Sequence, residues 1–532
     1  MAQAIRRSEN ETIDLDAAYV DRRPGADVWN CSIGEALRRT ASIHGQHRAL
    51  AWHDQGALHA LTWDELEAEA ERAARGILSI ISAGQRIAII GGNSRDWVVA
   101  EFACALAGTP LVPIEPTATN HECRHMLTQT DTRLVLSADE YRGASVLRRM
   151  RRLAAGSMND AVHVLRLGEW PTVETLTDLP DVRASDEFLV QHTSGTTGKP
   201  KGAVLSHYAA LNSARMYAHA TQPVENEVWL NPLPLSHVGG SVAGVLSALN
   251  TAGTYCVLPR FTPQSALDMI RDAGVTVLGL VPTMLLDLLN LPSASRRDFV
   301  HVRIQIGGAT AIDPALIERV EKEFDLRFLV GYGQSEAPCL TMSTLADSAE
   351  IRATTTGHPL PGREVSVKDV AGNFVSWGTP GELCVRSEMS MTGYLTATGK
   401  IAPAVDGHGW LHTGDLCSMS EDGIVQFHSR LREVIIRGGL NIYPAEVEQV
   451  LNEHPDVVET AVFGVPDVRL GHQLGVALIV RSPISIEALE RFAAKKLSMM
   501  KVPTYWHLVD EFPRTSTGKI RKIAVYEHLY PN

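Results

Sequence analysis

The sequence predicts an α/β protein with a large N-terminal domain of doubly wound sheets plus a small β subdomain, followed by a small α+β C-terminal domain. Three observations predict this fold class. Strands and helices alternate between residues 86 and 137 at the spacing of βαβ units, the 532 residues exceed one ordinary domain, and the charge balance changes near residue 431. We therefore expect the domains to span residues 1–430 and 431–532.

Local patterns place the N-terminal elements. The polar residues 1–30 are expected to form an extended arm, and a helical period begins at Ile33. The capping box Thr62-Trp-Asp-Glu65 opens a helix that ends near Leu78. Beyond this helix, buried strands alternate with helices, which predicts the doubly wound sheet. The expected strands are 86–90, 110–114 and 133–137, and the expected helices are 97–106 and 121–127.

The remaining elements follow the same reasoning. Residues 357–385 are rich in Gly, Pro and β-forming residues and are expected to form the β subdomain. Beyond residue 430, a helix opened by Pro444 follows a strand and a Gly turn, and further strands and a helix complete an α+β module. The expected strands are 275–281, 301–306, 327–330, 434–436, 459–465 and 476–480, and the expected helices are 208–220, 313–324 and 486–497.

Composition narrows the function classes. The chain is 45% hydrophobic and 21% charged, as is typical of a soluble globular protein. Its formal net charge is -12, and residues 431–532 hold 12 basic and 12 acidic residues, so all of the excess negative charge lies before residue 431. A nucleic-acid partner is disfavoured because it would require a basic face.

Three further features indicate a cytoplasmic protein without a membrane span. The seven cysteines are scattered and form no CxxC pair or metal-ligand spacing, as expected in a reducing compartment. The N-terminus lacks the apolar core of a signal peptide. The longest apolar stretch, residues 274–289, is interrupted by Pro282 and Asp287 and is too short to cross a bilayer.

A small, polar and cationic segment follows the buried strand that ends at Val190. Residues 192–207 read HTSGTTGKPKGAVLSH, in which glycines allow close approach to a phosphate and hydroxyl and lysine groups can bind it. A Walker P-loop is excluded because only two residues separate Gly195 from Gly198, and Pro200 follows the lysine. A solvated surface loop stays open on these residues alone. The helix expected at 208–220 would place its positive N-terminal end beside this loop.

Several other segments carry groups suited to nucleotide chemistry. In GYGQSEAP, residues 331–338, Tyr332 offers a flat face to an adenine, and Glu336 beside a triphosphate would need a cation such as Mg²⁺ between them. In GWLHTGDL, residues 409–416, Asp415 follows a tight turn and can accept from ribose hydroxyls. Arg430 can donate to ribose or phosphate. Each residue alone is equally consistent with a turn, a cap or a surface ion pair.

Two more candidates depend on context. His237 lies between Ser236 and a Gly pair in NPLPLSHVGG, residues 231–240, where a lone His is more often structural. Lys519 lies in PRTSTGKIRK, residues 513–522, where a cationic loop is usually only solvated.

Taken together, these segments resemble, in order, six motifs of the adenylate-forming superfamily: acyl-CoA synthetases, adenylation domains and luciferases. The one not yet described is SRLREVIIRGGLNIYPAEVE, residues 429–448, which is fifth in the chain, and the resemblance runs from about residue 33 to the end. It implies two half-reactions with ATP, Mg²⁺ and CoA. A carboxylate attacks the α-phosphorus of ATP to give an acyl-adenylate and pyrophosphate, and a thiol then displaces AMP. The RGGLNIYPAEVE segment and the TSTGKIRK ending resemble the acyl-CoA ligase branch.

The resemblance also implies roles for individual residues. The implied catalytic residues are Lys519, His237 and Glu336. Glu336 is also the implied Mg²⁺ ligand. Arg432 is the implied hinge of a mobile C-terminal domain. The implied ATP- and AMP-binding residues are Thr193, Ser194, Gly195, Thr196, Thr197, Gly198, Lys201, Gly308, Ala309, Gly331, Tyr332, Gly333, Gln334, Ser335, Asp415, Phe427 and Arg430. The implied acyl-pocket residues are Ser236, Val238, Gly239 and Gly307, and the implied CoA-binding residues are Gly438 and Gly439.

Four positions depart from the family pattern. Ser335 stands where Thr is usual, Ser236 where many members carry an aromatic residue, and Ser429 where Asp or Gly is usual. Ile436 stands where luciferases have Lys, which argues against a luciferase.

The sequence leaves three functions open. The first is an acyl-CoA ligase acting on a free acid, ATP and CoA. The second is a stand-alone adenylation enzyme that loads a carrier protein, or an enzyme that acts chiefly on a supplied acyl-adenylate. The third is a non-catalytic nucleotide-binding module, which the joint presence of His237, Glu336, Asp415 and Lys519 disfavours. The implied pocket holds little charge, so we expect an apolar or weakly polar acid and poor activation of a free amino acid; the oligomeric state stays open.

Overall fold

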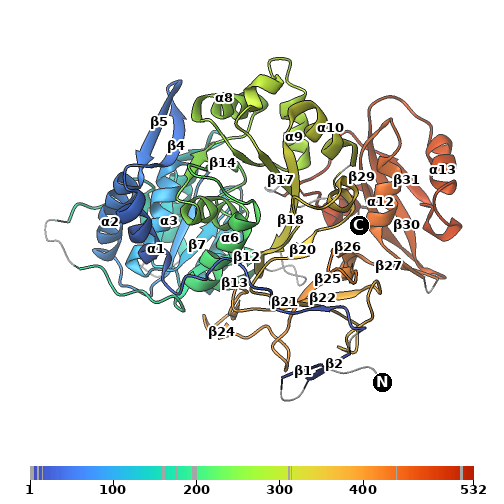
Figure 1. Cartoon of the computed structure of the whole chain (residues 1–532), viewed down its shortest axis with the longest axis horizontal. Helices are drawn as coiled ribbons and strands as arrows, with labels where there is room; N and C mark the ends of the chain where they lie inside the picture. The colour runs from blue at the N-terminus through green and yellow to red at the C-terminus, as the bar shows by residue number, and fades with distance from the viewer. Residues whose placement is uncertain are drawn as a thin grey trace.

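The computed structural model describes most of the chain. Figure 1 shows the elements after residue 430, coloured orange to red, gathered at the right, most of the blue to green N-terminal half at the left, and the dark blue N-terminal hairpin at the bottom. The described residues are 5–8, 11–14, 16–157, 162–173, 178–193, 200–308, 312, 314–438, 440–515 and 519–531. The mixed α/β fold predicted from the sequence is confirmed. Among the described helices, none combines the length and apolar composition that crossing a bilayer requires.

An eight-stranded sheet holds the first βαβ repeats and both strands that flank residues 194–199. In spatial order its strands are β11 (His163–Arg166), β8 (Leu134–Ser137), β6 (Ile87–Ile90), β7 (Leu111–Ile114), β12 (Glu187–Thr193), β13 (Lys201–Ser206), β23 (Gly393–Leu395) and β24 (Ile401–Ala402). β6, β7, β8 and β11 pair in parallel, as βαβ units require. β12 and β13 are antiparallel partners, with Thr193 opposite Lys201.

One expectation about this sheet is wrong. The helix expected beside the phosphate loop, α6 (His207–Ala220), begins only after β13, and Ser206 caps it by accepting from the backbone of Ala209. The six residues of β13 span roughly 20 Å at about 3.3 Å per residue. The positive end of α6 therefore does not lie beside the loop, because GAVLS continues the sheet before the helix can start.

A nine-stranded sheet forms the second large layer. In spatial order its strands are β20 (His358–Pro359), β19 (Ala337–Met342), β18 (Arg327–Gln334), β17 (Ile304–Gly308), β16 (Val277–Gly279), β14 (Val228–Leu230), β15 (Thr254–Val257), β4 (Arg48–Asp54) and β5 (Ala57–Thr62). β18 is longer than expected and carries the Gly-Tyr-Gly-Gln segment to its end, where Ser335 and Glu336 turn the chain into β19. The nucleotide candidates on this segment thus stand on a strand and its turn.

The helices cover these sheets, and their starts follow local capping. Thr62 and Glu65 form the expected capping box of α2, and α1, α2 and α3 pack against one another. The N-terminal helices are α1 (Ile33–His44), α2 (Trp63–Leu78), α3 (Arg95–Ala107), α4 (Asn120–Gln129) and α5 (Val146–Ser157). Those that follow α6 are the π-helix η1 (Ser241–Leu246), α7 (Ser247–Asn250), α8 (Pro263–Ala273), α9 (Pro282–Leu289), the short η2 (Arg296–Phe299), α10 (Pro314–Phe324) and α11 (Ala349–Thr354).

The β subdomain is a five-stranded antiparallel sheet that includes part of the N-terminal arm. Its strands are β26 (Val425–Arg430), β25 (Leu411–Met419), β22 (Gly381–Arg386), β21 (Glu364–Lys368) and β3 (Tyr19–Val20). β3 is an edge strand, Ala18 beside it is fully buried, and the Tyr19 hydroxyl donates to Glu364 at 2.9 Å. Residues 19–20 are therefore part of the sheet and not a free arm. The hairpin of β1 (Ile5–Ser8) and β2 (Glu11–Ile13) precedes them (Figure 1).

The C-terminal elements form their own five-stranded sheet. Its strands are β28 (Leu440–Ile442), β27 (Ile435–Arg437), β30 (Gly471–Val480), β29 (Val457–Asp467) and β31 (Tyr505–Leu508). The helices η3 (Leu431–Glu433), α12 (Pro444–Asn452), α13 (Ile486–Ala494), η4 (Met499–Lys501) and α14 (Lys522–Leu529) accompany it. This sheet pairs with none of the described strands before residue 431.

Candidate active site

Asp415 lies where three strands meet. Its carboxylate is fully buried, the hydroxyl of Tyr332 on β18 donates to Oδ2, and Nε of Arg430 on β26 lies 2.9 Å from Oδ1. Asp415 and Arg430 are cross-strand partners of β25 and β26, so the sheet register fixes their approach. Burial raises the pKa of Asp415, while Arg430 and Tyr332 oppose that rise. A buried carboxylate held between a phenol and a guanidinium is suited to accept hydroxyl donors such as those of a ribose.

Two neighbours extend this corner. The rings of Tyr332 and Phe427 lie 6.4 Å apart between centroids, and the amide of Gln334 donates to the Thr413 carbonyl at 3.4 Å. Thr413 in turn accepts from the backbone of Asp415 through Oγ1 at 3.1 Å. The predicted residues of β18, β25 and β26 are therefore brought together in one cluster.

Glu336 and Lys201 are linked through a residue that the sequence analysis missed. The hydroxyl of Tyr394 on β23 donates to Glu336 Oε1 at 2.8 Å, and the ammonium of Lys201 lies 5.4 Å from the centre of the same ring. Burial, and next the Glu336 carboxylate, raise the pKa of Tyr394, so it stays a neutral donor. The Tyr394 hydroxyl thereby orients the half-buried carboxylate of Glu336 near β13, the strand that follows the phosphate loop. Carboxylate oxygens are the ligands that Mg²⁺ prefers.

His237 and Ser236 meet a carboxylate that was not expected. Nε2 of His237 lies 3.0 Å from Oε1 of Glu115, and the Ser236 hydroxyl donates to the same oxygen. Gln191 on β12 donates to the Ser236 carbonyl at 3.0 Å. Glu115 directly follows β7, whose carboxyl end faces this segment, as a parallel sheet places its ligand groups. β12 therefore carries both Gln191, which contacts Ser236, and Thr193, which lies two residues further along the same strand.

The predicted acyl-pocket residues contribute mainly backbone. Val238 and Gly239 lead into the π-helix η1, and the Gly239 carbonyl accepts from the Asn231 amide at 2.8 Å. A Cβ on Gly307 would lie 2.6 Å from the Phe328 ring, and a Cβ on Gly308 would lie 2.2 Å from the Gly331 carbonyl oxygen. The glycines at the ends of β17 and β18 thus permit close approach of neighbouring strands.

The C-terminal segment brings a cation toward Asp415. Lys519 keeps an exposed face, but protein atoms surround much of its ammonium, and this desolvation lowers its pKa. The Arg430 charge lowers it further, whereas Asp415 raises it. The backbone of Lys519 is fixed by bonds in both directions with Thr515. Residues of the β subdomain and of the C-terminal segment therefore act on one another electrostatically.

The other predicted residues are less informative. Arg432 is exposed in η3, and Gly438 adopts φ +57° at the turn after β27. Gly331 and Gly333 lie on β18 beside Tyr332. The predicted residues Ser194, Gly195, Thr196, Thr197, Gly198, Ala309 and Gly439 lie outside the described residues.

Sequence reasoning missed Glu115, Gln191 and Tyr394. Gln191 adjoins the phosphate-loop motif, and its side-chain position on a buried strand was a usable signal. Glu115 and Tyr394 offered none, because their partners lie 121 and 58 residues away along the chain.

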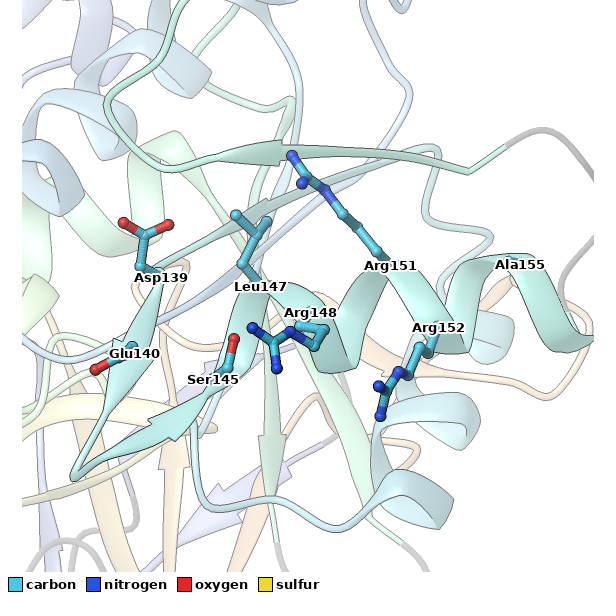
Figure 2. Close-up of a pocket in the computed structure, with 8 residues that line it drawn as sticks. All are labelled: Asp139, Glu140, Ser145, Leu147, Arg148, Arg151, Arg152 and Ala155. Carbon is cyan, nitrogen blue, oxygen red and sulfur yellow. The ribbon is translucent and has the colours of Figure 1, made fainter.

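A large hollow lies elsewhere. It measures about 880 Å³ and opens between helix α5, which presents Arg148, Arg151 and Arg152, and the β9–β10 hairpin (Glu140–Tyr141 and Ala144–Ser145), as Figure 2 shows. Asp139 at its edge pairs with Arg166. None of the predicted nucleotide or acyl residues lines this hollow, so the site is defined by the side-chain clusters above and not by the size of a cavity.

Known proteins resemble this chain over nearly its whole length. The family model described as AMP-binding enzyme matches residues 37–395, and that of the AMP-binding enzyme C-terminal domain matches residues 446–519. The human mitochondrial medium-chain acyl-CoA ligase ACSF2 is 32% identical over 94% of this chain and 87% of its own length. A Rhodococcus jostii ligase that joins CoA to a bicyclic methyl-dioxo-octahydroindenyl-propanoyl group is 31% identical over 92% of this chain and 98% of its own.

Solved structures agree with these relatives. ATP-bound MatB from Rhodopseudomonas palustris is 25% identical, covers 94% of this chain and 99% of its own, and superposes with a TM-score of 0.84. The apo form of MatB superposes on this chain with a lower TM-score of 0.74. The present chain is thus closer in overall arrangement to the nucleotide-bound form.

Proposed function

Because the chain belongs to the AMP-binding enzyme family, in the acyl-CoA ligase branch of the adenylate-forming superfamily, we propose that it activates a free carboxylic acid and transfers it to CoA. Family membership makes it an AMP-forming acid–thiol ligase that uses ATP. The proposal concerns the acid, the thiol acceptor, and the residues of the site.

One observation carries the proposal: Asp415 is held between Tyr332 and Arg430, and the charge of Lys519 in the C-terminal segment acts on the same carboxylate. The first half-reaction brings a carboxylate to a triphosphate, and two anions repel each other unless cations lie near both. Lys519 comes from the C-terminal segment, whereas Asp415 and Arg430 come from the β subdomain. An ammonium delivered to the nucleotide corner would stabilise the negative charge that develops as the acid attacks the α-phosphorus.

The proposal gives a role to each group of residues in the site. Asp415 and Tyr332 would hold the ribose and the adenine, and Arg430 would orient Asp415 or donate to the nucleotide. Glu336, held by Tyr394, would bind Mg²⁺, which when bound neutralises phosphate charge. Lys201, on the Tyr394 ring, lies on the strand that follows the phosphate loop and would donate to phosphate oxygens. The loop residues Thr193 to Gly198 would bind the same phosphates.

The acid would be an apolar or weakly polar monocarboxylate. Val238, Gly239 and the glycine-rich strand ends supply no charge, and the nearby carboxylate of Glu115 already accepts from Ser236 and His237. A second carboxylate on the substrate would be repelled by Glu115. Two relatives are named for a medium-chain and for a bicyclic propanoyl group, which supports an apolar acyl group here.

The acceptor, the domain boundary and the location complete the proposal. CoA would enter along Gly438 and Gly439 after the C-terminal domain, residues 431–532, rotates about Arg432 relative to residues 1–430. The seven cysteines form no disulfide, which favours the reducing cytoplasm. Cell fractionation would test that location.

The test is a substrate panel with the purified chain, ATP, Mg²⁺ and either CoA or a phosphopantetheinyl carrier protein. Aliphatic, aromatic, polycyclic, dicarboxylic and amino acids are compared, and acyl-AMP and acyl thioester are measured separately by mass. Acyl-CoA from an apolar monocarboxylic acid supports the proposal. Acylation of the carrier protein alone, products only from synthetic acyl-adenylates, or preferred activation of a free amino acid would overturn it.

A further inference from the structure

A mixed group of soft and hard ligands lies in the β subdomain, apart from the residues assigned to ATP. Glu382 and Cys384 are on β22 and His412 is on β25, and Cys384 and His412 are cross-strand partners. One ligand atom from each residue lies within 4.8 Å of the other two. Sγ of Cys384 is 3.5 Å from Nδ1 of His412, and Nδ1 is 2.7 Å from Oε2 of Glu382.

These distances suit a tetrahedral metal. Zinc bonds of about 2.3 Å to sulfur and 2.0–2.1 Å to nitrogen separate the two ligand atoms by about 3.6 Å at a tetrahedral angle. The observed separation of Sγ and Nδ1 already matches this value. The Nδ1 and Oε2 atoms lie 2.7 Å apart and would have to separate by about 0.7 Å to admit the ion.

Neighbouring groups hold the ligands in place. Nε2 of His412 lies 3.3 Å from Oδ2 of Asp406, so a proton on Nε2 leaves the Nδ1 lone pair for a metal. Oε1 of Glu382 accepts from the backbone of Gly414 at 2.9 Å, which leaves Oε2 directed toward His412. A carboxylate behind a ligating histidine is the usual outer support of a zinc site.

The local charges balance around a divalent ion. The Cys384 thiolate, Glu382 and Asp406 would contribute three negative charges, and the buried ammonium of Lys368, 3.9 Å from Asp406, contributes one positive charge. A divalent cation brings the group to neutrality. Thiolate and imidazole ligands select zinc over magnesium, which prefers oxygen.

We propose that Glu382, Cys384 and His412 bind one Zn²⁺ ion through Oε2, Sγ and Nδ1. The fourth ligand is water, because His412 remains 37% exposed and leaves that side of the group open. Binding releases the Cys384 thiol proton and the proton between Nδ1 and Oε2 to solvent. Glu382 also accepts a hydrogen bond from the backbone of Gly414, which precedes Asp415. The bound ion therefore stabilises the segment of β25 that carries Asp415.

The test uses the untagged full chain after treatment with a chelator. Zn²⁺ is titrated calorimetrically in excess Mg²⁺, and Co²⁺ is titrated in parallel to detect the absorption band of a cobalt–thiolate bond. We expect one ion per chain, a cobalt–thiolate band, and a rise in melting temperature with Zn²⁺. Cys384→Ser and His412→Asn should each weaken binding at least tenfold, and Cys384→Ser should abolish the band. Cys256→Ser, at a buried cysteine of the nine-stranded sheet, should change neither.

Two results would overturn the proposal. One is the absence of stoichiometric binding to the wild-type chain. The other is a cobalt–thiolate band that persists in Cys384→Ser, which would assign the metal to another cysteine. Circular dichroism of each variant, recorded without metal, separates lost binding from lost folding. ATP and acid are absent from the titration, so its outcome is independent of the proposed ligase activity.

Discussion

Individual side chains of the site are held by contacts that reach far along the chain. Asp415 is buried between Tyr332 and Arg430, and Glu336 is held by Tyr394. In each case a carboxylate is oriented by a donor from another strand before any nucleotide is present. Such preorganisation lowers the cost of binding hydroxyl donors or a cation, because the carboxylates need not rearrange when the ligand arrives.

Lys519→Ala should separate the two half-reactions. Removal of one strong electrostatic contact costs about 2.7–4 kcal/mol, so acyl-AMP formation should fall roughly 100- to 1000-fold. Transfer from a supplied acyl-adenylate to CoA should stay near the wild-type rate, because that step needs the C-terminal domain in another position. Rapid-quench assays of each step check this. Lys496→Ala, at an exposed lysine, is the matched control, and an equal loss in both steps would contradict the assigned role.

Glu115→Gln should relax discrimination against dicarboxylic acids. Glutamine keeps a group able to bond Ser236 but removes the negative charge near the acyl pocket. Relief of about 1 kcal/mol of repulsion corresponds to a gain of roughly fivefold in the ratio of kcat/KM for a diacid over its monoacid analogue. Steady-state kinetics with both acids measure the ratio. The exposed Glu140→Gln control should leave the ratio unchanged. An unchanged ratio in Glu115→Gln as well would show that Glu115 does not determine acid specificity.

Helices and strands whose ends depend on neighbouring residues could be predicted from the sequence. The capping box at Thr62 and Glu65 placed the start of α2, and the βαβ repeat placed β6, β7 and β8 within one residue. The same reasoning missed β13 between the phosphate loop and α6, because a short apolar run before a helix has no period of its own. It also missed η1, whose π-helical turns no local signal predicts.

Helix α3 carries a buried acid that should make stability depend on pH. Burial raises the pKa of Glu101 from 4.5 to about 8. Between these values the folded chain keeps a proton that the unfolded chain has released, so the free energy of unfolding falls as pH rises, by up to about 1.4 kcal/mol per pH unit. Below pH 4.5 both states are protonated and the penalty vanishes.

Glu101→Gln removes this dependence. Relative to wild type, the melting temperature of the variant should therefore rise progressively from pH 5 to pH 8 when followed by circular dichroism. Glu225→Gln, in an exposed turn, should run parallel to wild type. Parallel curves for Glu101→Gln as well would mean that the Glu101 carboxyl is not held protonated.

At the scale of the whole molecule, a short segment connects the C-terminal sheet to the rest of the chain. The C-terminal sheet, β27 to β31, connects to β26 through η3, and Lys519 reaches back toward Asp415. The chain superposes more closely on ATP-bound MatB than on apo MatB. No residue pattern fixes where the C-terminal sheet lies relative to the other sheets, because no pairing between described strands joins them.

Arg432→Pro should block the rotation and leave the present arrangement intact. Proline fixes φ and removes backbone freedom at the proposed hinge. Acyl-AMP formation should persist, while transfer from acyl-AMP to CoA should fall at least tenfold, or about 1.4 kcal/mol in barrier. Single-turnover assays of each step measure the split. Arg432→Ala, which retains a flexible backbone, should lose much less, and equal losses in both variants would assign the effect to the side chain.

The most direct test of the account follows oxygen atoms. The acid selected by the substrate panel is labelled with ¹⁸O in both carboxyl positions and turned over with ATP, Mg²⁺ and CoA, and the products are analysed by mass. Attack of the carboxylate on the α-phosphorus predicts one ¹⁸O in AMP and none in pyrophosphate. Label in pyrophosphate or inorganic phosphate, or acyl-CoA formed with unlabelled AMP, would contradict an acyl-adenylate formed at this site.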